Sequence, residues 1–77
     1  MRAEQVSRVF GHVLREQRIA RGISQEALAL TADVDRTFVS QMERGIRQPS
    51  ITTLIKLCKA LGVQPSVMVA RMEKMMR

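Results

Sequence analysis

Several polar side chains between positions 36 and 44 can recognise a partner through hydrogen bonds. Arg36 carries a planar fork of hydrogen-bond donors, which can bind the O6 and N7 atoms of a guanine. Gln41 can pair with an adenine, and Thr37 offers both a hydroxyl and a methyl group. Such contacts recognise a partner without breaking a covalent bond, so these residues favour a binding function, and we expect no enzyme activity.

Metal ligands and cysteines are sparse. His12 is the only histidine, and no Cys or carboxylate pair stands beside it at ligand spacing. Cys58 is the only cysteine and cannot form an internal disulfide, so we expect it to pack as a small hydrophobe, with a redox switch as the alternative. The sequence therefore predicts no metal, no cofactor and a reducing compartment such as the cytoplasm.

Length and charge limit the fold and its partners. The 77 residues have room for one domain with a small core, which a partner subunit would help to stabilise. The net charge of +6 favours a polyanionic partner, with nucleic acid before an acidic membrane surface. No apolar run resembles a signal peptide or approaches the ~18 residues that span a bilayer, so we expect no membrane partner.

Hydrophobic periodicity and cap residues predict five helices and no strand. The expected helices cover residues 6–21, 25–32, 36–44, 50–61 and 65–76. Ser24 and Asp35 are the N-cap candidates of the second and third helices. Gly22, Gly45 and Gly62 stand where the first, third and fourth helices should end. The second and third helices are short and separated by a very short turn, which presents the third as a surface helix.

The segment Ser24–Gly45, SQEALALTADVDRTFVSQMERG, resembles the helix-turn-helix of phage Cro and CI-type repressors, the XRE-like family. The resemblance runs from about Phe10 to Val63 and includes the runs RIARGISQ and ERGIRQPS. The run DRTFVS followed by ERGIR, in a chain barely longer than the domain, is most similar to the controller proteins of restriction-modification systems. One departure is Asp33, which stands where the family usually has Gly in the turn.

The resemblance implies a compact, all-α, lambda-repressor-like domain over residues 1–77 of a cytoplasmic protein of prokaryotic or phage origin. It implies a homodimer that binds a pseudo-palindromic operator in double-stranded DNA and regulates transcription. The residues implied to contact bases are Arg36, Thr37 and Gln41. Those implied to contact the DNA backbone or minor groove are Ser24, Gln25, Phe38, Ser40, Arg44, Arg47, Gln48, Ser50 and Thr52. Arg18 and Glu43 are implied to form a structural ion pair behind the third helix.

Some of these assignments have alternatives. Phe38 either touches DNA or packs inward, and Ser24 either contacts a phosphate or only caps its helix. Residues 50–76 are expected to join two subunits, with dimer contacts from Met68, Met72 and Met75. A lid over the core and a mobile tail are the alternatives for this methionine stripe.

Two other functions compete with this interpretation. An antitoxin of a toxin–antitoxin pair would bind a toxin and its own promoter with the same kind of domain. A basic protein resting on a membrane is disfavoured, because the Arg and Gln positions follow a DNA-reading register instead of one continuous lipid-facing helix. No residue in the sequence indicates a toxin or RNA polymerase as a partner.

Overall fold

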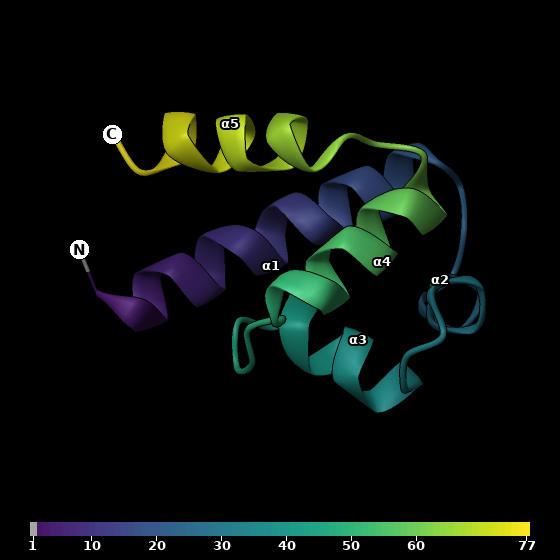
Figure 1. The fold of residues 1–77 in the computed structure, drawn as a ribbon. Helices are drawn as coiled ribbons and strands as arrows, with labels where there is room; N and C mark the ends of the chain where they lie inside the picture. The colour runs from purple at the N-terminus through teal and green to yellow at the C-terminus, as the bar shows by residue number, and fades with distance from the viewer. Residues whose placement is uncertain (1) are drawn as a thin grey trace.

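The helices lie close to where the sequence places them. The computed structural model describes residues 2–77, and within this range the chain forms five α-helices and no strand (Figure 1). The helices are α1 (Ala3–Ala20), α2 (Gln25–Ala32), α3 (Arg36–Glu43), α4 (Ile51–Leu61) and α5 (Pro65–Met75). The predicted all-α fold is confirmed.

Side-chain caps start α2 and α3 at the predicted residues. Ser24 Oγ accepts a hydrogen bond of 3.0 Å from the backbone N–H of Ala27. Asp35 Oδ1 accepts one of 2.8 Å from the backbone N–H of Thr37. Each bond satisfies a donor that the first turn of a helix leaves without a partner.

The first helix starts earlier than the hydrophobic pattern predicts. The pattern places the start near Val6, whereas α1 begins at Ala3, after Arg2, whose side chain makes no cap hydrogen bond. The additional turn is held by a distant residue, because Gln48 Nε2 donates to the Ala3 carbonyl and to Ser7 Oγ, both at 2.9 Å. Such a tertiary contact leaves no trace in helical periodicity.

Helices α1 and α4 form the middle of the molecule, with α5 on one side and α2 and α3 on the other (Figure 1). All five helices contribute fully buried side chains to the core, and the largest are Leu14, Leu28, Met42, Leu57, Leu61 and Met68. Cys58 is also fully buried, and this burial raises the pKa of its thiol. The thiol therefore stays protonated at neutral pH and packs as a small hydrophobe.

The methionine stripe of α5 closes the core of one subunit. Met68 is fully buried and Met72 is 8% exposed, whereas Met75 is 45% exposed. At the surface, an ion pair also joins α5 to α1, because Arg71 Nη2 donates to Glu16 Oε1 at 2.6 Å. The structure thus corrects the assignment of Met68 and Met72 to a dimer interface, because α5 covers the core with these two side chains.

Helices α1 and α3 cross at Gly11. A Cβ atom on Gly11 would overlap the Met42 carbonyl oxygen and would lie 2.8 Å from that of Glu43. Only a residue without a side chain lets α1 approach the end of α3 so closely. Hydrophobic periodicity does not predict this crossing. The only sign of it in the sequence is that Gly11 is an isolated glycine inside a helical pattern.

Within residues 2–77, no single helix is both long and apolar enough to cross a membrane. Helices α4 and α5 reach that length and composition only when taken together, and they are bent by 104° at the break between them.

Candidate nucleic-acid interface

The turn between α2 and α3 fixes the angle between these helices. Asp33 adopts the left-handed conformation, with φ 57° and ψ 50°. The backbone N–H of Val34 donates to the Ala29 carbonyl at 3.0 Å, which closes the end of α2. Asp tolerates left-handed backbone better than most residues, so the turn keeps its form without the usual glycine. Val39 and Met42 are fully buried and hold the inner face of α3 against the core.

The outer face of α3 is polar and open to solvent. Arg36 and Thr37 are exposed at its first turn, and Ser40 and Gln41 are half-buried one turn later. A hollow of about 210 Å³ between α2 and α3 is lined by Gln25, Arg36, Thr37 and Ser40. The structure therefore brings predicted base-contacting and backbone-contacting residues to one surface.

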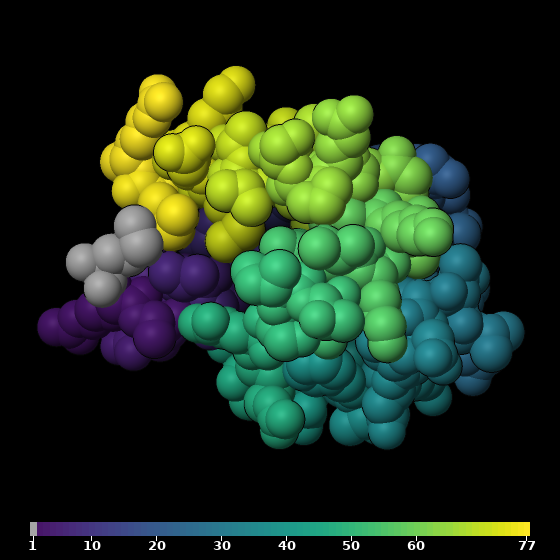
Figure 2. Space-filling view, in the orientation of Figure 1, coloured from purple at the N-terminus to yellow at the C-terminus, as the bar shows by residue number. Residues whose placement is uncertain are grey.

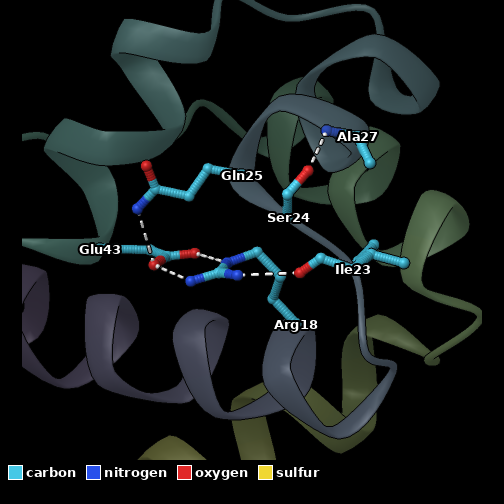
Figure 3. Close-up of polar contacts among 6 residues, drawn as sticks. All are labelled: Arg18, Ile23, Ser24, Gln25, Ala27 and Glu43. Carbon is cyan, nitrogen blue, oxygen red and sulfur yellow. Dashed lines mark hydrogen bonds and ion pairs between the residues drawn. The ribbon is translucent and has the colours of Figure 1, made fainter.

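Arg18 and Glu43 form an ion pair behind this surface (Figure 3). Arg18 Nε donates to Glu43 Oε2 at 2.6 Å, and Nη2 donates to Oε1 at 3.0 Å. The side chains of Arg18 and Glu43 are only 13% and 3% exposed, and Arg18 Nη1 also donates to the Ile23 carbonyl at 2.8 Å. The hydrogen bonds to Glu43 raise the pKa of the Arg18 guanidinium despite its burial, so Arg18 stays charged. The pair ties α1 to the last turn of α3.

Gln25 belongs to the same hydrogen-bond network. Its Nε2 atom donates to Glu43 Oε1 at 3.0 Å, while its side-chain oxygen points away from the ion pair (Figure 3). An amide nitrogen carries two donors, so one N–H of Gln25 remains available to a phosphate beside the start of α2. Gln25 thus has a structural contact that the sequence does not reveal, in addition to the phosphate contact expected of it.

Phe38 packs inward from α3. Its half-buried ring lies against the hydrophobic core, and the guanidinium carbon of Arg47 stands 5.6 Å from the ring centroid. This distance is within the range of a cation–π contact. Of the two alternatives for Phe38, the structure shows the packing role, and the exposed Arg47 is held over the ring.

The segment that follows α3 divides into structural and exposed residues. Gln48 anchors this segment to α1 through its side-chain amide. Ser50 caps α4, because its Oγ accepts a hydrogen bond of 3.1 Å from the backbone N–H of Thr53. Arg44 and Thr52 are exposed. The sequence predicts both Gln48 and Ser50 as DNA contacts. In the structure, their side chains make hydrogen bonds that hold the subunit together.

Comparisons with known proteins agree with this arrangement. The helix-turn-helix family model matches residues 14–68. The control protein C.BamHI of Bacillus amyloliquefaciens is 45% identical over 58 residues, which cover 74% of this chain and 72% of that protein. The crystal structure of the restriction-modification controller protein C.AhdI from Aeromonas hydrophila has a TM-score of 0.78 and 42% identity, covering 80% of this chain and 94% of that chain.

A further solved structure contains DNA. It is the restriction-modification controller protein C.Esp1396I, a tetramer in complex with its natural 35 base-pair operator. Its TM-score is 0.82 at 30% identity, with 90% of this chain and 91% of that chain covered. Since the family model spans most of the chain and these relatives share its sequence and fold, the protein is a member of the XRE-type helix-turn-helix family, as are the restriction-modification controller proteins.

Proposed function

We propose that this protein is a sequence-specific DNA-binding regulator of transcription that acts as a homodimer, in the manner of a restriction-modification controller protein. The observation that carries this proposal is the polar outer face of α3, which is exposed at Arg36 and Thr37 while its inner face is locked to the core. A rigid helix with hydrogen-bond donors on its free face is what the major groove of DNA accepts. The proposal includes no catalytic step.

In this proposal, some residues recognise DNA bases and others bind the DNA backbone. Arg36 and Thr37, in the first turn of α3, reach base edges, where an inserted recognition helix comes closest. Gln41 lies one turn further along the same face. The free N–H of Gln25 and the start of α2 bind a phosphate, which fixes the register of α3 without reporting sequence. Glu43 accepts hydrogen bonds from Gln25 of α2 and from Arg18 of α1, and these bonds keep α3 and the start of α2 in this relation.

The exposed apolar side chains of α4 and α5 supply the proposed subunit contact. Ile51, Ile55 and Val67 are 72%, 51% and 45% exposed, and exposed apolar side chains that gather in one patch mark a protein–protein interaction site. Beside Ile55, a hollow of about 460 Å³ between α4 and α5 has a largely apolar lining. These side chains replace Met68 and Met72 as the proposed dimer contacts, and the exposed Met75 remains a candidate.

Selection of bound duplexes from a random pool tests the proposal. The purified protein should enrich one pseudo-palindromic sequence, because two copies of α3 would read two equivalent half-sites. Recovery of duplexes without any common sequence would show that the basic surface binds DNA only through its charge. Failure to retain any duplex would overturn the proposal as a whole.

A further inference from the structure

We infer that Arg8 of α1 is an additional contact to the phosphate backbone of duplex DNA, acting with Arg44 and Arg47 as one basic corner. This inference rests on the proposed function and extends its binding surface beyond the helix-turn-helix unit. Arg8 lies far from residues 24–45 in the sequence, so only the fold can bring it to that surface.

The loop after α3 is packed directly against the backbone of Arg8. A Cβ atom on Gly45 would lie 3.0 Å from Arg8 Cα and 3.2 Å from its Cγ, so this part of the loop touches α1. Gln48 reinforces the contact through its 2.9 Å hydrogen bond to Ser7, the residue before Arg8. Figure 2 shows the start of α1, in purple, beside the green segment that follows α3. Arg44 directly precedes Gly45 and Arg47 follows it by two residues, so the backbones of all three arginines belong to this corner.

The charge of this corner is not balanced within the subunit. Arg8, Arg44 and Arg47 are all exposed, and none has an acidic partner at salt-bridge distance among residues 2–77. The ion pairs of that range use other arginines, namely Arg2, Arg18 and Arg71. Like charges gathered on one surface repel one another, and a bound polyanion that neutralises them removes this repulsion.

The position of the corner favours DNA as that polyanion. Arg44 is the C-cap residue of α3 and follows Arg36 and Ser40 at four-residue helical spacing, so it extends the helix face on which Arg36 and Ser40 lie. Arg47 is held in place by its contact with the Phe38 ring, which reduces the entropy lost when it binds a phosphate. A duplex seated on α3 thus meets Arg8 through its backbone, where a guanidinium can bind any sequence equally well.

The test compares Arg8→Gln with wild type by titrating a labelled operator and a scrambled duplex at several salt concentrations. Arg8→Gln removes one phosphate contact from each subunit of the dimer, so the slope of log affinity against log salt should fall by about 1.8, which is about 0.9 per contact. The affinity should fall by the same factor on both duplexes, because the contact carries no sequence information. Arg77→Gln, the same charge change at the end of α5, should retain the wild-type slope. Arg8→Lys should retain it as well, and equal melting temperatures exclude a folding defect.

Other results would overturn the inference. A wild-type slope and affinity for Arg8→Gln would mean that this side chain is merely solvated. A loss confined to the operator would mean that Arg8 reads a base and does not bind the backbone. If wild type binds neither duplex, the proposed function itself fails, and this outcome is distinct from an effect limited to the Arg8 variant.

Discussion

At the scale of single residues, Glu43 holds three contacts together. It accepts two hydrogen bonds from Arg18 and one from Gln25, and it is almost completely buried. Glu43→Ala would leave the Arg18 guanidinium desolvated without its partner, which typically costs about 3 to 5 kcal/mol. We expect a clear fall in the free energy of unfolding, measured by urea denaturation.

Gln41→Ala is the control for this prediction, because the Gln41 side chain makes no hydrogen bond within residues 2–77. Its unfolding free energy should stay within about 0.5 kcal/mol of wild type. Equal stability of the two variants would contradict the structural role of the ion pair.

Arg36 is the residue on which sequence discrimination should depend most. It is exposed, permanently charged and placed in the first turn of α3. Arg36→Ala should cost about 1 to 3 kcal/mol of binding free energy on the operator and flatten the preference at one base pair per half-site. Titration against single-base operator variants at fixed salt measures both effects.

Gln25→Ala gives the contrasting result. It should weaken binding to all duplexes by a similar factor, because a phosphate contact is independent of sequence. It should also lower the melting temperature, since Glu43 loses one of its hydrogen bonds. If Arg36→Ala instead weakened every duplex equally, Arg36 would be a backbone contact and discrimination would lie with Thr37 and Gln41.

At the scale of helices, the approach of α1 to α3 depends on Gly11. An added methyl group would meet backbone oxygens of Met42 and Glu43, which cannot move aside as a flexible side chain can. Gly11→Ala should therefore destabilise the fold by about 3 kcal/mol, the upper end of ordinary overpacking. Thermal unfolding followed by circular dichroism measures the loss.

Gly22→Ala separates crowding from backbone strain. Gly22 has a φ of 70° but nothing within 4 Å of its Cβ position. Its replacement should cost only the left-handed strain of about 1 to 2 kcal/mol. A larger loss at Gly22 than at Gly11 would mean that α1 and α3 do not cross as closely as the structure shows.

Sequence could predict these helices where the determining contact is local. Ser24 and Asp35 bond within their own first turns, so the starts of α2 and α3 follow from cap chemistry. The start of α1 depends on Gln48, 45 residues from Ala3, and no local pattern contains that contact. Because this contact is not local, the sequence predicts Gln48 only as a DNA contact, whereas the structure shows that it anchors the loop after α3 to α1.

Contacts between residues distant in the sequence also limit how much of the DNA-binding surface can be predicted. A resemblance can assign Arg36 or Gln25 by position in a motif, but Arg8 and Gly11 acquire their neighbours only when α1 lies against α3. Helical spacing identifies Met68, Met72 and Met75 as one apolar stripe, yet it does not say whether α1 or a second subunit covers it. The burial of Met68 and Met72 within one chain decides this point.

At the scale of the whole molecule, assembly and folding should respond to different residues of α4 and α5. Ile55 is exposed, so Ile55→Glu should leave the subunit folded and shift it from dimer to monomer. Met68 is fully buried, so Met68→Glu should unfold it, because a buried unpaired carboxylate is strongly destabilising. Sedimentation velocity and circular dichroism on each variant distinguish the outcomes. A folded, monomeric Met68→Glu variant would restore that residue to the interface.

The central claim is that two copies of this chain hold two α3 helices about 34 Å apart, one turn of DNA, and read one half-site each. The most direct test measures affinity and stoichiometry on the selected operator while the spacing between its half-sites is varied. We predict two chains per duplex, tightest binding at the selected spacing, and a loss of affinity toward that of a single half-site when about half a helical turn is inserted. Binding of one chain, with an affinity indifferent to the spacing, would contradict the claim.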